Sequence, residues 1–118
     1  MYGLPENFDV KMFFGKKIEL ICFSENTISL SFEENISITI MGSFVYKGSH
    51  DEIGEVLTPP ASSSELTSLI NQPVRNAEII DKSNLVFYFG NGQSVHILND
   101  CKEYESYIIK INEDEIIV

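Results

Sequence analysis

The stretch Leu85-Val86-Phe87-Tyr88-Phe89-Gly90-Asn91-Gly92-Gln93-Ser94-Val95-His96-Ile97 decides the fold, because an earlier stretch repeats its pattern. The earlier stretch is Ile28-Ser29-Leu30-Ser31-Phe32-Glu33-Glu34-Asn35-Ile36-Ser37-Ile38-Thr39-Ile40. A single offset aligns the two and places Phe32 on Phe89. The same sequence pattern therefore occurs twice in the chain.

The match continues upstream of both stretches with a slip of one residue. Gly15-Lys16-Lys17-Ile18 then aligns with Asn71-Gln72-Pro73-Val74. The chain of 118 residues has the size of one ordinary domain. We therefore predict a single domain, residues 1–118, with a pseudo-repeat over residues 14–40 and 70–97.

Apolar residues alternate with polar ones in both copies, which is the pattern of half-buried β-strands. In the first copy the residues expected to face the core are Ile28, Leu30, Phe32, Ile36, Ile38 and Ile40. In the second copy they are Leu85, Phe87, Phe89, Val95 and Ile97. Ser29, Ser31, Ser37 and Thr39 are expected on the opposite, outer face.

The alternation also predicts the register of the hairpins, because residues opposite each other must share a face. A three-residue loop, Gly90-Asn91-Gly92, pairs Phe87 with Val95 and keeps core residues together. Such a loop ends in a left-handed residue, which glycine suits. Glu33-Glu34-Asn35 predicts the same register in the first copy, with Asn35 in the left-handed position.

Further elements complete the predicted architecture. Residues 43–47 and 55–57 have the pattern of short strands, and residues 107–118 that of a C-terminal hairpin. Ser62-Ser63-Ser64-Glu65 resembles a capping box and predicts one short helix over about residues 63–71. The predicted fold is mainly β: a β-sandwich or partly open barrel built from two copies of a three-strand unit, plus one short helix.

The charge of the chain favours some partners over others. Eighteen acidic and eight basic residues give a formal net charge of -10, and Lys16-Lys17 is the only adjacent basic pair. We expect no nucleic-acid binding, which needs clustered Lys and Arg. The charge suits a basic protein partner, although it also serves solubility alone. The chain lacks a signal-peptide pattern and an apolar run of ~18 residues, so we expect a cytoplasmic protein without membrane contact.

The sequence offers little material for catalysis or metal binding. His50 and His96 are the only histidines, and no cysteine or histidine stands near either at metal-ligand spacing, so we expect no cofactor and no metal. Gly48-Ser49-His50-Asp51 contains the residue types of a catalytic triad, but adjacent residues cannot form its geometry. Cys22 lies in an apolar run and is expected in the core, whereas Cys101 lies in a polar turn.

The outer face of the second copy is less polar than that of the first. Val86 and Tyr88 stand where the first copy has Ser29 and Ser31. The sequence favours packing of the predicted helix against this face, because that helix must bury Leu66 and Leu69. The alternative is a subunit or partner interface, including a homodimer.

The chain resembles an uncharacterised family of small bacterial β-rich proteins, known as a domain of unknown function. The resemblance lies in residues 14–18, 37–44 and 85–95, and in a Tyr-Glu-small-aromatic signature at Tyr104-Glu105-Ser106-Tyr107. It implies no known catalytic residues. Size and acidity are similar to those of immunity proteins of bacterial toxin systems.

We expect a non-catalytic protein-binding module, with toxin neutralisation as its specific form. The residues expected to contact the partner are Tyr88, Tyr104, Glu105 and Tyr107. For the last three the alternative is an anchor at the start of a strand, in which each tyrosine buries its ring and its hydroxyl finds a partner. The alternative function is a small-molecule-binding β-barrel or weak hydrolase, with its site inside the sheet or near His50.

Overall fold

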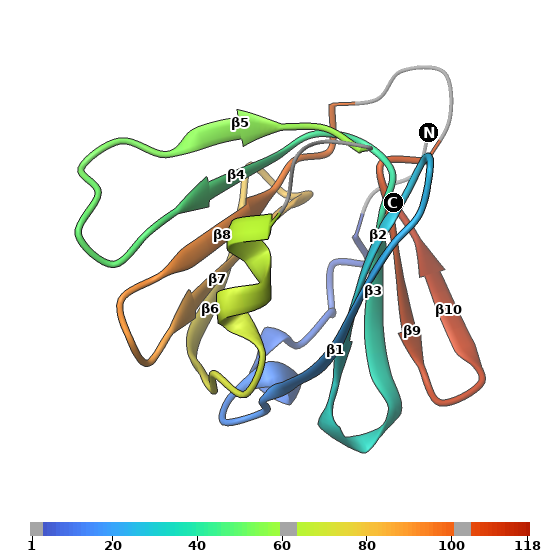
Figure 1. The fold of residues 1–118 in the computed structure, drawn as a ribbon. Coiled ribbons are helices and arrows are strands. Elements are labelled where there is room, and N and C mark those ends of the chain that lie inside the picture. Colours follow the sequence, from blue (N-terminus) through green and yellow to red (C-terminus); the bar gives the residue numbers. More distant parts are fainter. Residues whose placement is uncertain (1–3, 60–63, 101–104) are drawn as a thin grey trace.

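The computed structural model describes residues 4–59, 64–100 and 105–118, and the described strands form two five-stranded antiparallel sheets (Figure 1). The first sheet consists, in order, of β1 (Ile18–Phe23), β2 (Ile28–Phe32), β3 (Ile36–Ile40), β9 (Tyr107–Ile111) and β10 (Asp114–Ile117). The second consists of β5 (Glu55–Leu57), β4 (Phe44–Lys47), β8 (Ser94–Ile97), β7 (Asn84–Phe89) and β6 (Val74–Ile80). The predicted mainly β fold is confirmed, and it is a sandwich, because these strands form no closed barrel.

The predicted hairpin registers are confirmed. Phe87 lies opposite Val95, and β2 pairs with β3 in the same register. Gly92 and Asn35 are left-handed, with φ angles of 93° and 60°. Glu34 is also left-handed, at 64°, which the sequence did not indicate. The residues predicted to face the core in both copies are all buried.

The short helix differs from the one expected over residues 63–71. It is a 3-10 helix, η3 (Ser64–Leu69), and its expected capping residues lie partly outside the described residues. The chain leaves the helix early because the backbone N–H of Asn71 donates to the carbonyl of Ile18 (2.7 Å). Two further 3-10 helices, η1 (Val10–Phe13) and η2 (Glu33–Asn35), were not predicted.

Each sheet combines three strands from one half of the chain with a hairpin from the other half. The β4–β5 hairpin follows β3 in sequence but pairs with β8, and β9–β10 follows β8 but pairs with β3 (Figure 1). Phe44 lies opposite Ile97 in the second sheet, and Tyr107 lies opposite Ile40 in the first. The halves therefore correspond over five strands, two more than the predicted unit contains.

Backbone hydrogen bonds join the two halves at corresponding positions. The N–H of Gly15 donates to the carbonyl of Val74 (2.8 Å), and the N–H of Asn71 donates to that of Ile18 (2.7 Å). Gly15 and Asn71 are both left-handed, with φ angles of 79° and 71°. These four residues are the first and last residues of the two segments that the sequence aligned with a slip of one residue. The arrangement has a pseudo-two-fold relation at this junction.

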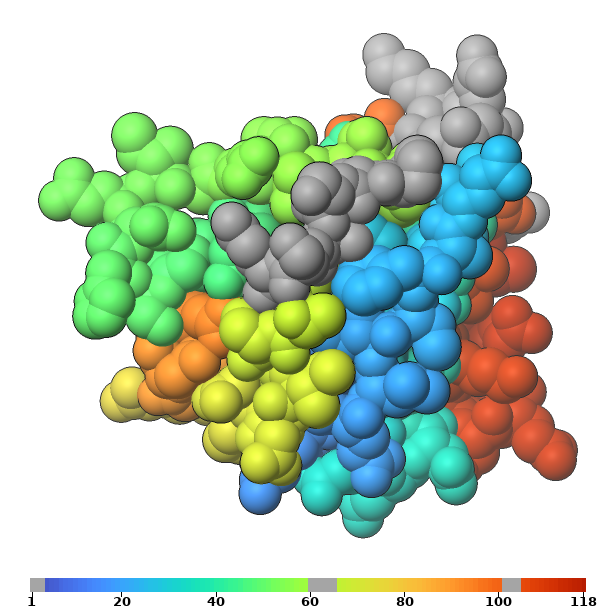
Figure 2. All heavy atoms as spheres, in the orientation of Figure 1, coloured from blue at the N-terminus to red at the C-terminus, as the bar shows by residue number. Residues whose placement is uncertain are grey.

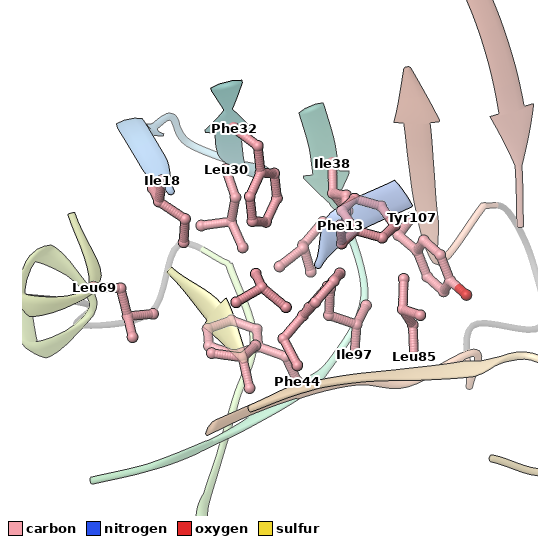
Figure 3. Packing of buried hydrophobic residues seen from close by; sticks show 14 of the residues in the cluster. Phe13, Ile18, Leu30, Phe32, Ile38, Phe44, Leu69, Leu85, Ile97 and Tyr107 are labelled. Carbon is pink, nitrogen blue, oxygen red and sulfur yellow. The ribbon is translucent and has the colours of Figure 1, made fainter. Parts of the chain in front are cut away.

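A phenylalanine cluster fills the space between the sheets. Phe13 of η1 lies between them, with ring centroids 5.4 Å from Phe32 and 4.8 Å from Phe87 (Figure 3). Both contacts are edge-to-face, the geometry that aromatic pairs favour. All three side chains are at most 2% exposed. One residue of a short 3-10 helix thus ties the two sheets together.

The helix η3 covers the core rather than the outer face of the second sheet. Its Leu66 and Leu69 are 1% and 0% exposed and belong to the same core cluster as Phe13 (Figure 3). The expectation that these leucines pack on Val86 and Tyr88 is wrong. The helix contacts β1 instead, where burying its leucines in the core removes their apolar surface from water.

Cys22 is exposed, contrary to the expectation that it lies in the core. The pairing of β1 with β2 shifts register between Ile18 and Leu20. Ile21 then faces inward, and Cys22 lies opposite Ser29 on the outer face. A local irregularity of the strand therefore changed which residue of the apolar run is buried.

We predict that Phe87→Ala lowers the free energy of unfolding by about 3–5 kcal/mol, because it removes a fully buried ring from the cluster. Phe23→Ala is the matched control, since Phe23 is 45% exposed, and its cost should be much smaller. Urea denaturation measures both. Equal costs for the two substitutions would contradict the position of the cluster.

Candidate functional site

The outer faces of the two sheets differ although their strands correspond. Across the first sheet, one row of opposing outer residues is Cys22, Ser29, Thr39, Ile108 and Ile117. The corresponding row across the second sheet is Glu78, Val86, His96, Val45 and Val56. The centre of the row on the first sheet thus carries the hydroxyl groups of Ser29 and Thr39. The centre of the row on the second sheet carries the aliphatic Val86 and the imidazole of His96.

The neighbouring row differs at one central position. Ser37 and Lys110 oppose each other on the first sheet, and Ser94 and Lys47 oppose each other on the second. Beside these similar pairs, the first sheet has Ser31 and the second has Tyr88. Tyr88 is therefore the residue that most distinguishes the second outer face, and Val86 beside it is only 4% exposed.

Tyr88 lies at a cavity of about 460 Å³. The cavity is lined by Arg75, Asn76, Glu78, Tyr88, Phe89, Gly92 and Gln93. The Tyr88 side chain is 37% exposed, and its hydroxyl donates to Oε2 of Glu78 (3.3 Å). Partial burial, and then the charge and hydrogen bond of Glu78, raise the pKa of Tyr88. The hydroxyl therefore stays protonated and keeps this bond at neutral pH.

Arg75, the only arginine of the chain, lies where the pairing of β6 with β7 shifts register between Val74 and Asn76. Its side chain is exposed. Tyrosine and arginine are the residue types enriched at the energetic centres of protein interfaces. The sequence pointed to Tyr88, but it gave no signal for Arg75, because only the fold brings this residue to the same cavity.

A buried amide forms part of the cavity wall. Gln93 is 4% exposed, and its Nε2 donates to the Tyr46 hydroxyl (2.6 Å) and to Oγ of Ser68 (2.6 Å). Asn91 Nδ2 donates to Oε1 of Gln93, so the amide is bonded at both ends. The corresponding residue of the first half is the apolar Ile36. The network fixes the β7–β8 turn beside Tyr88, and a glutamine at a core-facing position was its only sequence signal.

The side chain of His96 is half-buried. It lies on the outer face between Val45 and Val86, and its Nε2 atom is buried without a hydrogen-bond partner among the described residues. Burial lowers the pKa of His96, and the charge of Asp81 partly offsets this effect. The imidazole is consequently neutral at neutral pH and belongs to the apolar row of this face.

Of the other three predicted contact residues, Tyr107 does not join Tyr88. Tyr107 is fully buried, and its hydroxyl donates to the carbonyl of Ser83 (2.7 Å), while burial raises the pKa of the phenol. Tyr107 therefore has the geometry expected of an anchor at the start of a strand. Because its ring is buried, it offers no surface to a partner. Glu105 is half-buried just before β9, and Tyr104 lies outside the described residues.

A second cavity, of about 500 Å³, lies on the first sheet. It is lined by Ser31, Asn35, Ser37, Lys110, Asn112 and Glu113. The backbone N–H of Asn112 donates to the carbonyl of Asn35 (3.0 Å), which joins the β2–β3 and β9–β10 turns at this place. The lining is polar throughout and lacks an aromatic ring.

The described geometry defines an antiparallel β-sandwich with an aromatic and apolar outer face on one sheet and a hydroxyl-bearing one on the other. Comparisons with protein-family models, with curated proteins and with solved structures found no match. Within residues 4–59, 64–100 and 105–118, no group of three or more His, Cys, Asp and Glu side chains is placed to hold a metal ion. Nor does any helix in these ranges have the length and apolarity to cross a membrane.

We predict that His96 makes the free energy of unfolding fall as the pH drops from about 7.5 to about 5.5. The folded-state pKa of His96 lies below 6.5, so the unfolded chain takes up a proton first as the pH falls. His96→Thr, which introduces the residue of the corresponding position Thr39, should reduce this loss. Urea titrations at both pH values measure it, with His50→Gln as the control.

An unchanged pH dependence in His96→Thr would contradict the burial of the imidazole. The same would follow from a His96 pKa at or above 6.5 in a proton NMR titration.

Proposed function

We propose that this chain is a protein-binding module that contacts its partner through the outer face of the second sheet, around Tyr88 and Arg75. The observation that carries the proposal is the difference between the two outer faces. At corresponding positions the first sheet has the small Ser31 and the second has Tyr88, which lines a cavity of about 460 Å³ with Arg75.

The site is preorganised for binding. The Tyr88 hydroxyl is already bonded to Glu78, and the cavity wall is fixed by the buried Gln93. Little side-chain freedom is therefore lost when a partner docks on the ring, which lowers the entropic cost of association. The exposed guanidinium of Arg75 adds a planar group that bonds carboxylates or backbone carbonyls.

The charge of the chain supports a basic partner. The formal net charge is -10, and acidic residues gather at the β2–β3 and β9–β10 turns, which a hydrogen bond joins. A field of one sign speeds the approach of an oppositely charged protein. Together with the resemblance to small bacterial proteins of immunity-like size, this favours a basic toxin as the partner, met in the cytoplasm.

The test begins with capture of a partner by the tagged chain from a lysate of its native cells, followed by titration of the purified pair. We predict that Tyr88→Ala weakens binding by about 30-fold or more, as for central interface tyrosines. Arg75→Ala should weaken it by about 10-fold. Ser31→Ala, at the corresponding position of the first sheet, is the matched control and should leave binding unchanged.

Wild-type affinity in both Tyr88→Ala and Arg75→Ala would overturn the assignment of this face. Capture of no partner at low salt would count against the binding module itself. A partner that loses affinity with Ser31→Ala instead would move the interface to the first sheet.

A small polar ligand is the second candidate function, favoured by the cavity of about 500 Å³ on the first sheet. Its hydroxyl, amide and ammonium groups suit a polyhydroxylated molecule, which needs several hydrogen-bond partners. A thermal-shift screen of sugars and polyols tests it. A sugar or polyol that raises the melting temperature of the wild-type chain but not of Lys110→Ala would support the site. If no compound raises the melting temperature, this candidate is removed.

A further inference from the structure

The β4–β5 loop breaks the correspondence between the halves. The corresponding hairpin, β9–β10, turns within residues 112–113, whereas β4 and β5 are joined by residues 48–54. The extra residues project from the body of the sandwich, at the left of Figures 1 and 2. A longer loop at only one of two corresponding places is unexplained by the fold itself.

This hairpin presents apolar side chains to solvent. Ile53 is 85% exposed and Val56 is 65% exposed, more than the other large apolar side chains of the described residues. Val56 also ends the apolar row that runs through Val45 and His96 to Val86. Exposed apolar groups that continue along one face mark a contact surface.

Exposed acidic residues neighbour Ile53 in the sequence of this loop. Asp51, Glu52 and Glu55 are exposed, and Lys47 is the only lysine or arginine of this hairpin. Asp51 and Glu52 directly precede Ile53, whereas Glu55 lies opposite Tyr46, on the other face of the strand from Val56. The loop therefore offers an exposed aliphatic side chain beside two carboxylates. A protein surface complementary to it has an apolar pocket with Lys and Arg on its rim.

The loop has a defined conformation. The N–H of Gly48 donates to Oδ2 of Asp51 (3.0 Å), and the N–H of Asp51 donates to the carbonyl of Gly48 (3.2 Å). Ser49 packs against Gly92, where an added Cβ would lie 3.6 Å from the Ser49 Cα. Gly92 also lines the Tyr88 cavity, so the loop and the cavity form one continuous surface.

We propose that the tip of the β4–β5 hairpin anchors the partner protein, with Ile53 inserted into an apolar pocket whose rim carries Lys or Arg. This inference rests on the proposed function and extends its interface from Tyr88 to Ile53. A second copy of this chain is disfavoured as the occupant. Its own charge is -10, and its outer faces carry carboxylates that would repel Asp51 and Glu52.

The experiment uses the full chain and a display library of domain-sized fragments from the genome of the source organism. Fragments selected on the wild-type chain are purified and titrated against variants. We expect Ile53→Asp to lower affinity by about 30-fold or more and Ile53→Leu to retain it. The matched control is Leu20→Asp on β1, because Leu20 is 53% exposed and lies on the first sheet.

Charge is tested separately with Glu52→Lys. This variant should slow association with the selected fragment by about 10-fold at low salt, and added salt should remove the difference. Urea denaturation of each variant verifies that the exposed positions leave the fold intact.

The outcomes separate this inference from the proposed function. If Tyr88→Ala loses the fragment and Ile53→Asp keeps it, the anchor is overturned and the proposed face stands. Equal affinity in all variants, or no selected fragment, overturns both. Sedimentation that shows a wild-type dimer split by Ile53→Asp would make a second copy the occupant and overturn the anchor as proposed.

Discussion

The exchange of hairpins between the two halves is the constraint on which the rest of the structure depends. Neither half completes its own sheet. In the first sheet β9, from the second half, lies next to β3, and in the second sheet β4, from the first half, lies next to β8. The bonds of Gly15 and Asn71 join the starts of β1 and β6, and Phe13 fills the space between the sheets. The outer face of the second sheet therefore contains strands from both halves, so the proposed interface forms only when the whole chain has folded.

The correspondence between the halves also shows where function is to be sought. Positions that face the core are apolar in both copies, with one exception. Gln93 of the second copy stands at the position that Ile36 occupies in the first. Outer positions differ more, as Tyr88 and Ser31 illustrate. Packing restricts the inner positions, whereas the outer ones are free to specialise. The buried Gln93 network, the Tyr88 cavity and the long β4–β5 loop all belong to the second sheet, and together they make it the specialised one.

Much of the fold followed from local pattern in the sequence, and the rest depended on contacts between distant residues. Alternation predicted the inner residues of the two copies and the register of the β2–β3 and β7–β8 hairpins, because both depend on neighbours in the chain. No local pattern in the sequence indicates that β3 pairs with β9. The alternating apolar residues of β3 would suit β4, the next strand in the chain, equally well as a neighbour. The 3-10 form of η3 likewise follows from a bond to the distant Ile18, whereas the exposure of Cys22 follows from an irregularity in the pairing of β1 with β2 that alternation alone does not indicate. For the site, the sequence indicated Tyr88, but only the fold placed Arg75 beside it and buried Tyr107 away from it.

Nuclear Overhauser contacts between backbone protons of paired strands test the hairpin exchange most directly. We expect contacts between Ile38 and Ile109 and between Val95 and Tyr46, the pairs that join β3 to β9 and β8 to β4. Contacts that instead join β3 to β4 in one continuous sheet would contradict the exchange. They would also remove the basis for a single interface built from both halves of the chain.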